Sequence, residues 1–197
     1  QKYTKVAGLA GLTVLNIETE LLTLARAIAP SNQTVLVADL GATSTDIAIV
    51  RSGQLVVSRS IATAGNVLSR AVAQGLSINT QQSEEYKKTY GMAGHALEGK
   101  VKTLLSPIFN IIVDEMKKTV QYYKTELREQ DQPTSAILTG GTAGMVEVTV
   151  ILAEKLGMEV IVGDPFGRIA KDERTAKALG PWAPLYAISV GLAEKGL

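Results

Sequence analysis

The sequence predicts an α/β protein in which a mixed β-sheet is flanked by helices. Apolar strand-like segments alternate with segments of helical periodicity, as in proteins that cover a sheet with helices. One pair of strand-like segments is joined by a short glycine turn, which indicates an antiparallel hairpin inside this alternation. The composition, 46% hydrophobic and 20% charged, is typical of a soluble globular protein.

Apolar spacing and turn residues define the elements of the first part of the chain. Residues 16–30 predict a helix capped by Asn16, because apolar side chains recur along one face at helical spacing. Residues 34–40 are continuously apolar and β-branched, which predicts a strand buried on both faces. Residues 46–50 and 55–61 flank a glycine turn and form the predicted hairpin.

The rest of the sequence predicts three helices, a short strand, a helix, a second short strand and a closing helix, at residues 65–74, 80–91, 98–130, 135–141, 144–156, 158–165 and 183–196. The third helix is expected to be interrupted, or to begin again, near Pro107. Pro184 falls in the first turn of the closing helix, where proline is well tolerated.

Charge and composition exclude several classes of function. The chain has 20 basic and 19 acidic residues and a formal net charge of +1, with the basic residues scattered, so there is no electrostatic case for nucleic acid. The absence of cysteine excludes a disulfide framework and a thiolate nucleophile. No apolar run is long enough to cross a bilayer, so we expect no direct membrane insertion.

Two other patterns carry no function. Residues 94–101 nearly match a phosphate loop, but Val101 stands where a hydroxyl must bind magnesium, and the segment follows a predicted helix instead of a strand. His95, the only histidine, has no acidic or serine partner within a few positions, which predicts an exposed loop residue.

The stretch from Ala38 to Val50, "ADLGATSTDIAIV", places an aspartate on each side of a turn of small residues. Such a turn lets successive backbone N–H groups approach an anion closely. Carboxylates beside a phosphate require a divalent cation between them, so Asp39 and Asp46 imply magnesium held through water. The alternative is a tight hairpin with two solvated aspartates.

A second glycine turn favours the phosphate interpretation. In "ILTGGTAG" an apolar strand leads to Gly140 and Gly141, where a flat ring can rest on bare backbone. Ligands of open α/β sheets bind at the carboxyl ends of the strands. The two turns therefore predict the two ends of one nucleotide site.

In chain order, "VLVADLGATSTDIAIV", "ATAGNVLSRAV", "SEEYKKTYG", "AILTGGTAGMVEVTVILAEKLG" and "APLYAISVGLA" resemble the actin-like ATPase superfamily, which includes Hsp70 chaperones, sugar kinases and FtsA. The linking segments look most like the PilM-like family of type IV pilus assembly proteins. The resemblance extends from about Gly11 onward. It implies an actin-like ATPase (ribonuclease H-like) fold with ATP and Mg²⁺ as cofactors.

The resemblance also implies roles at the phosphate end of the site. The amides that hold the β and γ phosphates are expected from Gly41, Ala42, Thr43 and Ser44. Asp39 is expected to order the magnesium waters, while Asp46 supports the hairpin. Glu18 falls in the predicted helix where relatives keep an acid or amide that orients the attacking water. Hsp70 and FtsA keep three consecutive glycines where this chain has Gly41, Ala42 and Thr43, a departure that nucleotide binding tolerates better than fast hydrolysis.

At the nucleoside end, the resemblance places Gly65 in the loop near the phosphates. Glu84 and Lys87 match positions that hydrogen-bond the ribose and base, although residues at this spacing can also form a simple surface pair. The adenosine motif corresponds to Gly140, Gly141 and Thr142, with Gly144 close by.

The same resemblance predicts that the first lobe is largely missing. The expected parts are a remainder of that lobe, a second lobe made of a sheet subdomain and a helical insertion, and a closing helix, at residues 1–30, 31–183 (31–62 and 133–183; 63–132) and 184–197. Because half of the phosphate clamp is absent, we expect this chain alone to bind nucleotide weakly or not at all, and to be at most a slow ATPase.

The function implied is an ATP-binding cytoplasmic scaffold at the inner face of the inner membrane, where nucleotide acts as a conformational switch. The partners implied are the cytoplasmic tail of a PilN-like membrane protein, other pilus assembly components and a second copy of the protein. An FtsA-like division protein would end in an amphipathic membrane helix. A sugar or acetate kinase would need a second acidic loop, and an Hsp70-like chaperone a peptide-binding domain. None of these three features is evident in the sequence.

Overall fold

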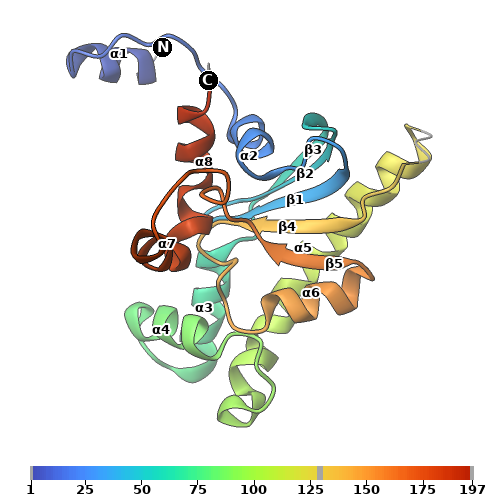
Figure 1. The fold of residues 1–197 in the computed structure, drawn as a ribbon. Coiled ribbons are helices and arrows are strands. Elements are labelled where there is room, and N and C mark those ends of the chain that lie inside the picture. Colours follow the sequence, from blue (N-terminus) through green and yellow to red (C-terminus); the bar gives the residue numbers. More distant parts are fainter. Residues whose placement is uncertain (1, 128–130, 196–197) are drawn as a thin grey trace.

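The computed structural model describes residues 2–127 and 131–195, and its centre is a five-stranded sheet with helices on both faces (Figure 1). The strands are β1 Thr34–Leu40, β2 Thr45–Arg51, β3 Gln54–Ile61, β4 Ser135–Thr139 and β5 Glu159–Val162, in the order β3-β2-β1-β4-β5. β2 pairs antiparallel with β1 and β3, whereas β4 pairs parallel with β1 and β5. The predicted mixed sheet, including its hairpin, is confirmed.

The helices are α1 Lys2–Leu9, α2 Glu20–Ile28, α3 Gly65–Leu76, α4 Thr80–Tyr90, α5 Lys100–Thr125, α6 Val148–Leu156, α7 Glu173–Leu179 and α8 Ala183–Ala193, with short 3-10 helices η1 Ala96–Gly99 and η2 Gly180–Trp182. α2 and α8 pack together on one face of the sheet, and α3, α5 and α6 cover the other (Figure 1).

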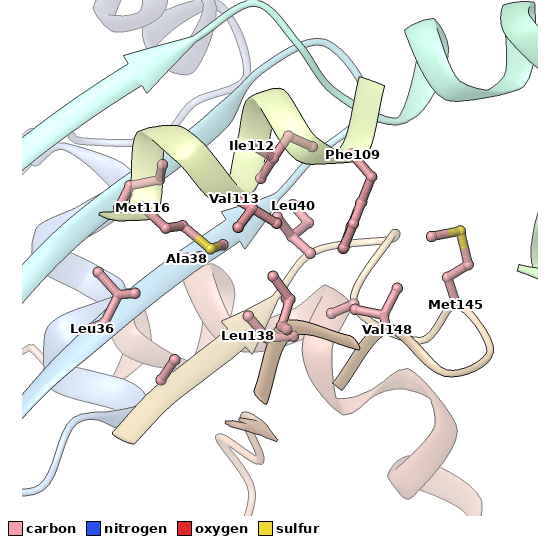
Figure 2. Packing of buried hydrophobic residues seen from close by; sticks show 14 of the residues in the cluster. Leu36, Ala38, Leu40, Phe109, Ile112, Val113, Met116, Leu138, Met145 and Val148 are labelled. Carbon is pink, nitrogen blue, oxygen red and sulfur yellow. The ribbon is translucent and has the colours of Figure 1, made fainter. Parts of the chain in front are cut away.

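β1 is the centre of the hydrophobic core because its side chains alternate between the two faces. Leu36 and Leu40 pack with α5 and β4 in the larger apolar cluster (Figure 2). Val35 and Val37 belong to the second cluster, which includes Leu24 of α2 and is fully screened from solvent at these positions. The prediction of a strand buried on both faces is confirmed.

The predicted start of the first long helix is wrong. α2 begins at Glu20, and the Asn16 side chain caps no helix but accepts a hydrogen bond from its neighbour Ile17 at 2.7 Å. The Ile17 side chain, expected on the buried stripe, is 67% exposed. The helical spacing of apolar residues therefore extends beyond the segment that packs as a helix. Packing against neighbouring elements decides where most helices end.

Three further differences from prediction concern helices. Pro107 does not interrupt α5, since the neighbouring Leu105 and Phe109 are fully buried against the core and hold the helix together across the missing N–H group. α6 starts at Val148, because Glu147 has a left-handed backbone (φ 60°) that a helix cannot include. α1 and α7 were not predicted, and the expected end of α5 near residue 130 lies outside the described residues.

The two discounted patterns are placed as predicted. Residues 94–101 form η1 and the start of α5 and do not follow a strand. The His95 side chain is 82% exposed and lies 3.7 Å from Glu147. Neither contributes to a phosphate site.

The segment before α2 lies apart from the sheet (Figure 1). α1 buries none of its residues, and Tyr3, Leu9 and Leu15 are each more than 80% exposed. No helix among the described residues is both long and apolar enough to span a membrane.

Tyr123 on α5 provides a test of the core. Its side chain is fully buried, yet its hydroxyl has no hydrogen-bond partner within the described part of the chain. An unpaired buried hydroxyl is costly, so Tyr123→Phe is expected to raise the free energy of unfolding by about 1 kcal/mol. Urea unfolding measures this. Tyr122→Phe, on the exposed side of the same helix, should change stability little, and a loss of stability in Tyr123→Phe would contradict the unpaired state of the Tyr123 hydroxyl.

Candidate functional site

A cleft of about 660 Å³ opens where β1 and β4 end, between the two glycine turns. The predicted residues that line it are Asp39, Gly41, Ala42, Gly65, Glu84, Lys87, Gly140, Gly141, Thr142 and Gly144. Thr43 and Ser44 lie in the same turn as Gly41 without lining the cleft, and Glu18 lies elsewhere. The fold thus brings together residues that are up to about a hundred positions apart in the sequence.

The turn between β1 and β2 presents free backbone donors. Gly41 donates its N–H to the Ser44 carbonyl at 3.1 Å, and the Ser44 hydroxyl donates to Asp46 at 2.8 Å. Within the described residues, no backbone hydrogen bond uses the N–H groups of Ala42, Thr43 or Ser44. Gly41 therefore shapes the turn, while the next three amides are available to an anion.

The first turn of α3 is attached to this loop. Gly65 and Asn66 donate their N–H groups to the carbonyls of Gly41 and Ala42, at 3.0 and 2.9 Å. A Cβ at Gly65 would lie 2.9 Å from the Thr142 hydroxyl, so only glycine lets the helix, the first turn and the second turn meet. Gly65 is thus a spacer whose amide is already used.

Asp39 lies at the end of β1, opposite Asp46 on one neighbouring strand and Thr139 on the other. Its side chain is only 8% exposed and accepts a hydrogen bond from the Thr139 hydroxyl at 3.2 Å. Burial, helped by the charges of Glu20 and Asp46 and opposed by the hydrogen bond from Thr139, raises the pKa of Asp39 to about 6. A buried carboxylate held against this cost is poised to receive positive charge.

The donor set fits a magnesium ion carried by a phosphate ligand. The described residues contain no group of three or more acidic, histidine or cysteine side chains arranged as a metal site. Mg²⁺ commonly keeps several waters and binds through one or two carboxylates together with substrate phosphates. Asp39 would supply one carboxylate to such an ion, whereas Asp46 accepts the hydrogen bond from Ser44 in the turn.

Lys87 and Glu84 join α4 to α3. The Lys87 ammonium donates to Glu84 at 2.8 Å, to the Ser69 hydroxyl at 2.9 Å and to the Gly65 carbonyl at 3.2 Å. Lys87 is only 4% exposed, so the alternative of a surface pair is wrong for this residue. Burial raises the pKa of Glu84, but hydrogen bonds from Lys87 and Ser69 outweigh it and lower the pKa overall. Lys87 therefore makes its contacts within the protein and holds α4 against α3.

The second glycine turn lies against Asp39. Gly140 has a positive φ of 84°, and a Cβ there would stand 2.4 Å from the Asp39 carboxylate. Its N–H donates to the Pro184 carbonyl at 3.0 Å, and the Thr142 N–H donates to the Leu40 carbonyl at 3.1 Å. The turn is therefore fixed to both β1 and the start of α8.

An apolar wall completes the cleft, and sequence reasoning missed it. Pro181, Trp182, Leu185 and Ile188, from η2 and α8, line the side next to the Gly140 turn. No sequence signal marked these residues, because the position of η2 depends on a loop after β5 that has little periodicity. Asn66 and Lys88 also line the cleft and were not singled out.

Glu18 is not brought to the cleft. It precedes α2 and pairs with Arg26 at 2.9 Å and with Lys195. The hydrogen bond from Lys195, supported by Arg26, lowers the pKa of Glu18. Glu20, the first residue of α2, instead acts on Asp39 through its charge. The predicted role of Glu18 in orienting water stays a prediction that this placement does not favour.

Comparisons with known proteins agree with the fold. The family model described as type IV pilus assembly protein PilM matches residues 10–197. The cell division protein FtsA of Pseudomonas aeruginosa is 26% identical across the whole chain, which covers 51% of FtsA. The chain thus spans about half the length of this relative.

Solved structures that resemble this chain have the same fold at lower sequence identity. A PilM-PilN type IV pilus biogenesis complex aligns with a TM-score of 0.78 at 23% identity, over 97% of this chain and 57% of the other. MreB5 of Spiroplasma citri bound to AMPPNP aligns with a TM-score of 0.75 at 19% identity, over 98% of this chain and 62% of the other. These neighbours show that the fold is that of the actin-like ATPases.

Proposed function

Because this chain belongs to the PilM family of type IV pilus assembly proteins, we propose that it binds ATP with Mg²⁺ and serves as a scaffold for pilus assembly. In this proposal the nucleotide acts as a conformational switch and is not turned over rapidly. The chain lies at the cytoplasmic face of the inner membrane and contacts the cytoplasmic tail of a PilN-like protein. The PilM-PilN complex supports this choice of partner.

One observation carries the proposal: both glycine turns meet at the buried Asp39 carboxylate. Ala42 lines the cleft, and its free amide, with those of Thr43 and Ser44 in the same turn, would hold the phosphates, while Asp39 would hold the cation through water. Mg²⁺, when bound, neutralises charge between that carboxylate and the phosphates. The backbone of Gly140 and Gly141 and the adjacent apolar wall would receive the base, and Glu84, which is held by Lys87 and lines the cleft, would contact the ribose.

The N-terminal segment supports the proposed conformational switch. Residues 1–30 are proposed as the remainder of a first lobe, residues 31–183 as the second lobe and residues 184–197 as the closing helix. The exposed apolar side chains of α1 and of the segment after it are suited to pack on such a lobe. Phosphates that contact two lobes only in the closed state shift the population toward that state.

Within the same fold, an FtsA-like division protein is the second candidate, favoured by the identity to FtsA across the whole chain. A sugar or acetate kinase is disfavoured, because a kinase needs a base poised for an acceptor hydroxyl. Besides Asp39, the carboxylate that lines the cleft within the described residues is Glu84, which is committed to Ser69 and Lys87.

Calorimetric titration of magnesium-ATP into the chain tests the proposal. We expect binding that is weak for this chain, stronger when a first lobe is added, and lost in Asp39→Asn. Asp114→Asn makes the same chemical change at an exposed position of α5 and should leave binding intact. Equal affinity of the Asp39→Asn and unmodified chains would contradict the phosphate assignment, and rapid ATP turnover on addition of a sugar would favour a kinase.

A further inference from the structure

We propose that Trp182 is a base-contacting residue of this site and that its indole ring stacks on the aromatic base of the bound nucleotide. The inference rests on the proposed function, since it names a determinant of ligand choice in the same cleft. Trp182 is the only tryptophan of the chain and lines the cleft from η2. At 56% exposure it offers a large flat apolar surface beside the cleft.

The wall that carries Trp182 is fixed to the glycine turn. The Pro184 carbonyl, two residues after Trp182, accepts the Gly140 N–H at 3.0 Å. Leu185 lies 3.5 Å from the point where a Cβ of Gly141 would stand. The glycine turn, Leu185 and Trp182 therefore all line the cleft, and Leu185 lies beside the turn.

The charged groups of the cleft come from other elements than Trp182, and Asp39 lies beside Gly140 of the glycine turn. Glu84, Lys87 and Lys88 line the cleft from α4, and Asp39 lies at the end of β1. A ligand with one charged end and one flat aromatic end would place its aromatic end against η2 and α8. That division matches a nucleoside phosphate and gives no place for a second charged group at the Trp182 wall.

A second groove on the surface is also bordered by Trp182. Trp182 also lines a separate groove of about 480 Å³ with Phe166, Leu179 and Tyr186, where the rings of Phe166 and Tyr186 are 6.2 Å apart. The indole thus stands between the groove and the cleft. Stacking on it depends on ring area and not on hydrogen bonds, so it favours any aromatic base without distinguishing adenine from guanine.

Calorimetry with two ligands tests the inference. Magnesium-ATP and magnesium tripolyphosphate, which lacks the base, are titrated into the unmodified chain, Trp182→Leu, Trp182→Phe and Tyr186→Leu. We expect Trp182→Leu to weaken ATP binding roughly tenfold and to leave tripolyphosphate binding unchanged. Trp182→Phe should retain most of the affinity. Tyr186→Leu removes an aromatic ring from the groove but not from the cleft, and should bind ATP normally.

The outcomes separate this inference from the proposed function. If Trp182→Leu loses affinity for both ligands equally, or its unfolding midpoint falls, the residue is only structural and the inference is wrong. Unchanged ATP affinity in Trp182→Leu overturns the inference while the proposed function stands. If the unmodified chain binds no ATP, both fail. Quenching of the Trp182 fluorescence by magnesium-ATP, but not by tripolyphosphate, is the expected spectroscopic result.

Discussion

Asp39→Asn is expected to stabilise the ligand-free protein by about 2 to 3 kcal/mol at pH 8, although it removes a residue of the site. Burial raises the pKa of Asp39 from 3.8 to about 6, so the folded state favours the protonated carboxyl. The ionised form that predominates above pH 6 is costly to bury, and each unit of pKa shift corresponds to about 1.4 kcal/mol. An uncharged amide avoids that cost.

The pH dependence of the free energy of unfolding shows whether the Asp39 carboxyl stabilises or destabilises the fold. Since the pKa of Asp39 is higher in the folded than in the unfolded state, its favourable contribution is complete below about pH 3.8 and is lost as the pH rises through about 6. The advantage of Asp39→Asn should therefore be small at pH 4 and largest above pH 6. Urea unfolding across this range measures it, with Asp114→Asn as the exposed control. A difference that does not change with pH would contradict the buried, ionised carboxylate.

Gly191→Ala is expected to destabilise the protein by about 3 kcal/mol or more. A Cβ at Gly191 would stand 2.0 Å from the Thr23 carbonyl oxygen and 2.7 Å from its carbon, so α2 and α8 would have to move apart. Overpacking of this kind against backbone has no cheap relaxation. The separation would also break the 2.6 Å hydrogen bond from Arg26 to the Gly191 carbonyl.

Thermal or urea unfolding of Gly191→Ala measures this loss. The matched control is Gly8→Ala, since Gly8 lies in α1 and has nothing within 4 Å of its missing Cβ. That variant should be neutral or slightly stabilised, because alanine is the better helix former. Similar stability of the two variants would contradict the close contact of α2 and α8.

The central strands could be predicted from sequence because their signals are local. Continuous apolar residues predicted β1, and the small residues after it predicted the turn that carries the free amides. The ends of α2 and α6 could not be predicted, because packing of neighbouring elements and the left-handed Glu147 decide where those helices begin.

The glycine turns and the apolar wall of the site also differed in how well the sequence predicted them. Gly140 could be identified because a glycine pair follows an apolar strand, and the structure gives the reason for that glycine, since no side chain fits there beside Asp39. Trp182 and Leu185 gave no sequence signal, since they reach the cleft only through the packing of η2 and α8 on the sheet. The pairing of Glu18 with Lys195 spans nearly the whole chain and likewise has no local pattern.

The central claim is that Asp39 is kept buried and ionised in order to bind a cation-nucleotide complex. Thermal unfolding of the unmodified chain and of Asp39→Asn at pH 8, each with and without magnesium-ATP, tests it most directly. We predict that Asp39→Asn melts higher than the unmodified chain without ligand, and that magnesium-ATP raises the melting temperature of the unmodified chain only. A lower melting temperature of ligand-free Asp39→Asn, or an equal rise in both proteins on adding magnesium-ATP, would contradict the claim.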